Sequence, residues 1–204
     1  MARGPTPDEI FDRAVAEGQR RIDQSLLELV STSFIAGFTI VFGLIGLGIV
    51  EGALPAGAHG VARLGGALAF GVGVAGALPP GTTEALATVG TESAGRELGA
   101  SFARAIAGGA LVSLLSFLLV SVESEGSRLA LAYIVGVFLA LGPFEHVVVT
   151  ALHVLLGVLF GAGVGPVRFA TVMSVVTAGN VVGGLGLVTV AHVTQAAGAR
   201  ASGG

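Results

Sequence analysis

The sequence predicts an all-α, polytopic membrane protein, and two observations support this class. Of its 204 residues, 53% are hydrophobic and only 11% are charged, with a mean hydropathy of +0.90, whereas a soluble domain carries about 25% charged residues. The apolar residues also form long runs without any charge, such as the run between Glu28 and Glu51. A helix that crosses a bilayer needs about 20 mostly apolar residues, and most of these runs are near or above that length.

Five apolar segments are expected to form a transmembrane domain over residues 31–196. They cover about residues 31–50, 61–78, 101–122, 129–160 with a break at 142–145, and 167–191. A polar stretch at 79–99 separates the second segment from the third, and residues 197–204 are expected to form a disordered tail. Four arginines precede the first span, which predicts a multi-pass protein of the cell membrane with a cytoplasmic N-terminus.

Residues 1–30 are expected to form an amphipathic helix. Its start is marked by Thr6 as a cap, Pro7 at the first helical position and Glu9 three residues after the cap. Apolar residues then recur at helical spacing, opposite charged ones. Such a helix lies along a membrane surface or packs against a neighbouring subunit, and the sequence favours neither of these alternatives.

Composition also excludes several classes of function. Cysteine is absent, and every basic residue is an arginine with no cationic patch. These features argue against a cysteine-based metal site and against nucleic-acid binding. The sequence has no G-x-S-x-G motif, no H-E-x-x-H motif and no glycine-rich phosphate loop. We therefore expect neither an enzyme nor a resident metal or cofactor.

The fourth segment contains the stretch LALGPFEHVVVTALHVLLG, in which Gly142 and Pro143 interrupt the helical pattern. Backbone groups freed inside a membrane must bond to protein or line a cavity, and broken helices are typical of transport sites. We expect the second half-helix to begin at about Phe144. Glu145 and His146 would then occupy its first turn.

Thr150 and His153 follow His146 at spacings that place all three on one helix face. Ionisable groups at membrane depth usually mark a pathway, so we interpret His146 as functional. For Glu145 a structural role is favoured, in which its carboxylate accepts hydrogen bonds from backbone amides of the broken turn. For His153 we favour a structural hydrogen bond to a neighbouring helix.

The fifth segment carries TAGNVVGGLG, residues 177–186. Gly179 and Gly183 form a G-x-x-x-G pattern that lets another helix approach closely, and Gly184 extends this small surface. Asn180 is the one strongly polar side chain nearby. It is expected either to bond the free carbonyls around Gly142 or to line the same cavity as His146.

Phe144-Glu145-His146 after a helix break, followed one span later by Gly179-Asn180-Val181-Val182-Gly183-Gly184, resembles the formate/nitrite transporter family. The resemblance covers residues 101–195 well and the N-terminal helix and first span more loosely. It implies a pentamer of aquaporin-like subunits, each with its own pore for small monovalent anions. It further implies that His146 is the central pore histidine, Glu145 its acidic neighbour and Asn180 the polar residue of the last span.

The chain departs from that family in its first half. The family has two inverted halves of three spans, and its second span is broken by a loop whose threonine faces the histidine. Here the first repeat is incomplete, lacking the second half of the second span and the third span, and no residue inherits the role of that threonine. Five crossings would also leave the termini on opposite sides. The alternatives are a second segment that dips in and returns, an inverted C-terminal part, or a deletion, which we favour.

These observations predict a channel or proton-coupled transporter for small monovalent anions, of the formate/nitrite type. His146 would give a proton to the permeating anion, along a pathway that also includes Phe144, Glu145, Thr150 and Asn180. The alternative is a non-conducting relative, structural or part of a mixed oligomer, that has lost half of its pore. The expected partners are the bilayer, anions, protons and other copies of the chain, most simply in a pentamer. The cavity beside His146 is expected to be wider or wetter than a family pore, or to be collapsed by Phe70 and its neighbours.

Overall fold

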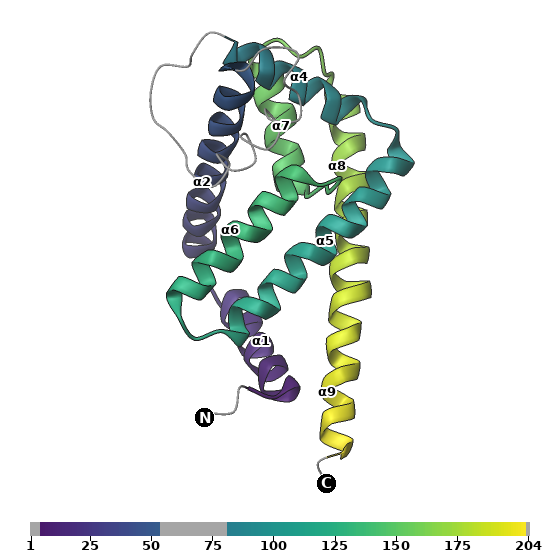
Figure 1. Cartoon of the computed structure of the whole chain (residues 1–204). Coiled ribbons are helices and arrows are strands. Elements are labelled where there is room, and N and C mark those ends of the chain that lie inside the picture. The colour runs from purple at the N-terminus through teal and green to yellow at the C-terminus, as the bar shows by residue number, and fades with distance from the viewer. Residues whose placement is uncertain (1–4, 54–80, 203–204) are drawn as a thin grey trace.

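The computed structural model describes residues 5–53 and 81–202 (Figure 1). The expected second segment, at 61–78, and Phe70 lie outside these residues. Every regular element in the described part is helical, as an all-α protein requires. The helices are α1 (Pro7–Ile22), α2 (Leu26–Ala53), α4 (Thr82–Gly95), α5 (Leu98–Ser121), α6 (Glu125–Leu141), α7 (Val147–Leu159), α8 (Pro166–Val181), the π-helix η1 (Val182–Thr189) and α9 (Val190–Ser202).

Both termini lie at the same end of the molecule, which we call the terminal end (Figure 1). Helix α2 rises from it to the opposite end, where α4 lies across the bundle. Helix α5 descends, α6 and α7 together ascend, and α8, η1 and α9 descend again. Ala53, the last residue of α2, and Thr82, the first residue of α4, belong to helix ends at the α4 end. The expected second crossing, at 61–78, lies outside the described residues, so the number of crossings stays a prediction.

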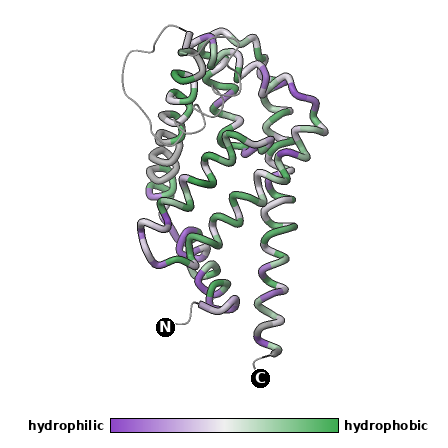
Figure 2. The backbone as a smooth tube through the Cα atoms, viewed as in Figure 1, coloured by the Kyte–Doolittle hydropathy of each residue, from purple (hydrophilic) through white to green (hydrophobic). Residues whose placement is uncertain are grey.

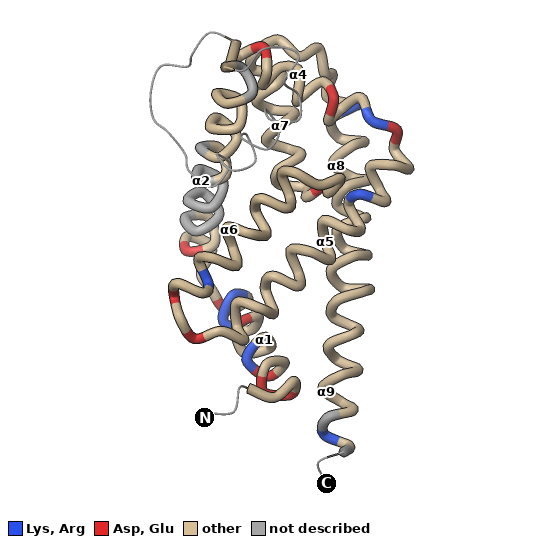
Figure 3. The backbone as a smooth tube through the Cα atoms, in the orientation of Figure 1, with Lys and Arg blue, Asp and Glu red and all other residues tan. Residues whose placement is uncertain are grey.

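Two of the described helices are long and apolar enough to cross a membrane. They are α5, with 24 residues, and the continuous helix Pro166–Gly198, with 33 residues. Only 17% and 28% of their apolar windows are buried inside the protein, whereas the core helix of a soluble protein is mostly covered. Apolar residues line the middle of the bundle and charged residues gather at its two ends (Figures 2 and 3). Apolar helices left open in this way are typical of a helical membrane protein.

Helix α1 begins as its sequence signals indicate. The Glu9 carboxylate accepts a hydrogen bond from the Thr6 amide at 2.8 Å, and Pro7 occupies the first turn. Arg20 and Arg21 both bond the Glu17 carboxylate and lower the pKa of this exposed group to about 2. The charges of this surface network are therefore retained throughout the neutral range.

The first span begins earlier than its sequence suggested, because α1 ends at Ile22 and α2 starts at Leu26. The expectation of one amphipathic helix through residue 30 is therefore wrong. Ser25 and Glu28 form a second capping box: the Glu28 carboxylate accepts from the Ser25 amide at 2.8 Å, and the Ser25 hydroxyl accepts from the Glu28 amide at 3.3 Å. The Ser-x-x-Glu pattern that starts a helix was present in the sequence and overlooked.

The polar stretch at 79–99 contains a helix, α4, rather than only a connecting loop. Its Gly90 faces Gly157 of α7 so closely that a Cβ added to either glycine would overlap the other's Cα atom. Leu86 is also buried, next to Gly48 of α2. Small residues on one face let α4 cover the ends of α2 and α7, which hydropathy alone does not reveal.

The last helix differs from the expected segment in two ways. Its middle part, η1, has π-helical geometry, and α9 continues to Ser202 through most of the tail expected to be disordered. Helix α9 packs against α1, and Arg200 forms an ion pair with Asp12. The expected disorder is thus wrong for residues 197–202, because contacts with a distant helix support a segment that is weakly apolar by itself.

Candidate functional site: the helix break

The interruption between α6 and α7 covers residues 142–146. Helix α6 closes with a 2.8 Å hydrogen bond from the Gly142 amide to the Phe138 carbonyl, and Pro143 lies in the non-helical stretch that follows. Gly142 has no Cβ atom, which leaves room for the Phe144 ring beside it. The break lies about midway between the two ends of the bundle (Figure 1).

The second half-helix begins at Val147, three residues later than expected. His146 is its N-cap residue, with extended backbone at φ −115° and ψ 130°, and Glu145 precedes it. Neither residue lies in the first helical turn, so that expectation is wrong. Proline disfavours helical geometry in the residue before it and cannot donate a hydrogen bond, but the extended stretch continues past it because contacts with other helices hold Glu145.

Asn180, near the end of α8, bonds the backbone on both sides of His146. Its Oδ1 accepts from the Val147 amide at 2.8 Å, and its Nδ2 donates to the Glu145 carbonyl at 2.8 Å. The same Nδ2 also donates to the Ala105 carbonyl of α5 at 2.8 Å. One side chain thus supplies partners for freed backbone groups that lipid cannot satisfy. It reaches these groups at Glu145 and Val147, not around Gly142.

Glu145 is buried, with 3% of its surface exposed. Its carboxylate Oε1 accepts from Arg96 Nη1 at 2.9 Å and from the Ser101 hydroxyl at 3.4 Å, and its own amide donates to the Arg104 carbonyl at 3.1 Å. The expected bonds from backbone amides of the broken turn to the carboxylate are not among these contacts. A buried carboxylate needs a cationic partner. The sequence therefore predicts that an arginine pairs with Glu145, but it does not identify which arginine.

Arg168 of α8 fixes the turn from which Arg96 extends. Its Nε donates to the Ala94 carbonyl at 2.6 Å, and its Nη2 donates to the Arg96 carbonyl at 2.5 Å. Arginine's planar fork suits two such acceptors. Sequence reasoning missed Arg96, Ser101 and Arg168, because each acts on a residue far from it in the chain.

Glycines bring the backbones around the break into contact. On α5, a Cβ at Gly108 would overlap the Glu145 backbone, and a Cβ at Gly109 would overlap the Asn180 backbone. Glycines of α8 and η1 approach α5 in the same way. Gly179 of α8 lies against Ala105 and Phe102. In η1, Gly183 lies against the Ile106 carbonyl and Gly184 against the Ser113 hydroxyl. Small residues permit this approach. The adjacent pair in α5 was not predicted, although its GG dipeptide was visible.

The polar face of α7 is enclosed to different degrees. His146 is half-buried and makes no side-chain capping bond. Thr150 is 3% exposed, and its amide donates to the His146 carbonyl at 2.8 Å. His153 Nε2 is buried and has no hydrogen-bond partner among the residues that the structure describes. The described residues contain no group of three side chains suited to a metal ion.

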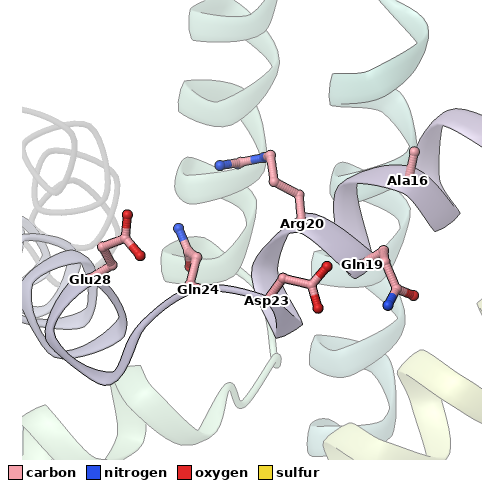
Figure 4. Close-up of a pocket in the computed structure, with 6 residues that line it drawn as sticks. All are labelled: Ala16, Gln19, Arg20, Asp23, Gln24 and Glu28. Atoms are coloured by element: carbon pink, nitrogen blue, oxygen red, sulfur yellow. The ribbon is translucent and has the colours of Figure 1, made fainter.

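A shallow hollow of about 620 Å³ lies at the corner between α1 and α2, far from the break (Figure 4). It is lined by Ala16, Gln19, Arg20, Asp23, Gln24 and Glu28. The hollow is open, and none of these side chains belongs to the site around Glu145.

A broken apolar helix, clamped by an asparagine and carrying a buried carboxylate beside a histidine, defines a membrane protein of the transport class. The family model described as formate/nitrite transporter matches residues 74–194, which is more than half of the chain. The chain therefore belongs to the formate/nitrite transporter family. The matched residues include the whole break and Asn180, but not the first expected span. A comparison with curated proteins finds no match.

Proposed function

We propose that the chain conducts small monovalent anions across a membrane through a pathway that passes His146. The observation that carries this proposal is the clamp of Asn180 on the backbone on both sides of His146. The clamp supplies backbone partners at membrane depth, so that the His146 side chain is free of any capping role. Membership of the formate/nitrite transporter family supports an anion as the substrate.

The mechanism follows from the cost of moving charge into hydrocarbon. A bare anion pays a large desolvation penalty, whereas the neutral acid pays much less. The N-terminus of α7, which follows His146 directly, attracts an arriving anion through the positive end of its helix dipole. Histidine titrates between about pH 5 and 8, so His146 is suited to donate a proton to a weak-acid anion. Phe144 and Thr150 complete the pathway in this proposal.

Uptake of formate and nitrite into liposomes containing the purified protein tests the function. We expect uptake above that of empty liposomes, rising as external pH falls from about 8 to about 5, because more His146 is protonated there. His146→Phe should reduce uptake by at least about a hundredfold, the lower part of the range for loss of a proton-transfer group. His192→Phe, the same change in α9, is the control and should keep native uptake.

Two results would contradict parts of the proposal. Uptake by the native protein that is constant over this pH range, after subtraction of empty liposomes, would exclude proton donation by His146. Native uptake in His146→Phe would exclude any pathway past this residue.

A non-conducting role is the second candidate, and a specific observation favours it. The family match covers residues 74–194 and leaves the first expected span outside it, and the sequence offers no residue for the role of the family's pore threonine. If the native protein is folded in liposomes and yet passes neither anion, a structural or mixed-oligomer role replaces the transport proposal.

We further propose that the protein is a multi-pass protein of the cell membrane with both termini in the cytoplasm. Arg13, Arg20, Arg21, Arg128 and Arg200 belong to the terminal end, whereas Arg96 and Arg168 belong to the α4 end. Cytoplasmic ends carry the excess of arginine. Cysteines introduced at residue 8 and at residue 92 are expected to be, respectively, protected from and reactive with an impermeant reagent applied outside the cell.

We also propose that the protein forms a homo-oligomer, because large apolar side chains are exposed on its outer surface. Large apolar side chains such as Leu185 and Leu187 are 62% and 57% exposed, and a Cβ added at the nearby Gly186 would meet no atom within 4 Å. Small residues favour close association of helices in lipid, and membership of the family favours a pentamer. Light scattering of the detergent complex should give about five times the 20.1 kDa chain mass, and a monomer at every concentration would exclude it.

A further inference from the structure

Arg104 is a charged residue at the depth of the break that has no task in the proposed mechanism. Its carbonyl accepts a hydrogen bond from the Glu145 amide at 3.1 Å, and the break lies about midway between the two ends of the bundle (Figure 1). Arg104 is also the one charged residue in the sequence of α5. A charge at membrane depth is costly, and such residues usually mark the route of a substrate or ion.

The guanidinium of Arg104 has no carboxylate partner. It forms neither an ion pair nor a hydrogen bond within the part of the chain that the structure describes, although the side chain is half-buried. Glu145, the buried carboxylate at the break, pairs with Arg96 instead, at 2.9 Å. Arg168 bonds backbone carbonyls and brings no negative charge. The described part of the site therefore carries an excess of positive charge.

Arg104 leaves α5 on the face that meets the break. Ser101, three residues earlier, donates to the Glu145 carboxylate at 3.4 Å, and Gly108, four residues later, lies against the Glu145 backbone. Residues at these spacings share one face of a helix. His146 directly follows Glu145, so Arg104 and the proposed proton donor belong to the same contact between α5 and the break.

We propose that Arg104 binds the permeating anion and selects planar anions that carry two oxygens on one central atom, such as formate and nitrite, over spherical anions such as chloride. This inference rests on the proposed transport function, whose substrate class it narrows. The guanidinium presents parallel N–H donors that match two such oxygens. A spherical ion offers no second oxygen for the other donor.

The two residues then have separate tasks. Arg104 supplies positive charge and geometry while the anion is still ionised, and His146 supplies the proton. When the proton passes from His146 to a formate oxygen, the product is neutral formic acid. The neutral acid forms weaker hydrogen bonds with a guanidinium than the carboxylate does, so the proton transfer also favours release from Arg104.

A lipid phosphate offers the same oxyanion chemistry as the permeating anion. Phosphates lie at the two membrane surfaces, however, whereas the Arg104 backbone is level with the break at mid-bundle. Long cationic side chains reach the surface from positions near helix ends. The depth of Arg104 thus favours the permeating anion as its ligand.

NMR of ¹³C-labelled formate, with the protein in a neutral detergent, tests binding without any need for transport. We expect native protein to broaden the formate line, and excess nitrite, but not equal chloride, to reverse the broadening. Arg104→Gln should remove it. Arg104→Lys keeps the charge but not the planar fork, and should bind formate about tenfold more weakly, the equivalent of one hydrogen bond to a charged group.

Arg13→Gln is the matched control, because Arg13 is exposed on α1, far from the break. It should broaden the formate line as the native protein does. Native broadening in Arg104→Gln would overturn the proposal. A ³¹P line of added phosphatidylglycerol that shifts with native protein but not with Arg104→Gln would assign the side chain to lipid phosphate, and would overturn it equally.

Uptake into liposomes tests the selection. The ratio of formate uptake to chloride uptake should fall about tenfold in Arg104→Lys, the same loss of one hydrogen bond to a charged group, and should stay native in Arg13→Gln. A native ratio in Arg104→Lys would overturn selection by Arg104. If Arg104→Gln does not fold, Arg104→Lys serves in both assays. Native protein that binds formate but transports neither anion would count against the transport proposal alone.

Discussion

Asn180→Leu is expected to lower the free energy of unfolding by about 3 kcal/mol. Leucine has nearly the same size but cannot bond the Val147 amide or the Glu145 carbonyl, each at 2.8 Å in the native protein. Each group left unpaired costs roughly 1–3 kcal/mol, and lipid offers no replacement partner. Denaturant unfolding in detergent micelles, followed by helical circular dichroism, measures this change.

Ser174→Ala, earlier on α8, is the matched control for this substitution. The Ser174 hydroxyl is exposed and bonds only the Ala170 carbonyl of its own helix at 2.9 Å, so the change should stay within about 0.5 kcal/mol of the native protein. If Asn180→Leu unfolded at the same denaturant concentration as Ser174→Ala, the clamp would have no energetic role at the break.

Gly183→Ala is expected to destabilise the protein by about 2 kcal/mol, whereas Gly186→Ala should be neutral or stabilising by up to about 1 kcal/mol. The two glycines lie in the same π-helix. A Cβ at Gly183 would overlap the Ile106 carbonyl of α5, but a Cβ at Gly186 meets no atom within 4 Å. Replacing glycine by alanine favours helix in both cases, so a difference in sign isolates the contact with α5.

The same unfolding measurement applies to both glycine variants. Anion uptake provides a second measurement, because Gly109 of α5 lies against the Asn180 backbone close to the contact of Gly183. Displacement of α5 by Gly183→Ala should therefore also reduce anion uptake, while Gly186→Ala should leave uptake unchanged. Equal stability of the two variants would show that the close approach of α5 and η1 contributes little.

Hydropathy and local patterns in the sequence were sufficient to predict an all-α membrane protein with an interrupted helix. Both signals are local, because an apolar run needs no partner to be recognised, and proline acts on its own helix. The pair of motifs around His146 and Asn180 also predicted the family, which the match to residues 74–194 confirms. The roles of His146, Thr150 and Phe144 in a pathway remain predictions.

Other features depended on contacts between residues far apart in the sequence. Glu145 is 49 residues from Arg96, and Asn180 is 75 residues from Ala105, so no periodicity could relate them. Helix α4 was overlooked because its buried face consists of small residues, and the helical end of the chain was overlooked because α1 supports it.

What the sequence by itself determined, then, is which segments are apolar, where the fourth segment breaks and which polar residues accompany the break. Only the tertiary structure decided that α7 begins at Val147, that Arg96 neutralises Glu145 and that both termini lie at one end. The physical reason is that apolar composition is a property of each segment alone. The partner of a buried polar group, by contrast, is chosen by how closely backbones approach, and here glycines on α5, α8 and η1 set that approach.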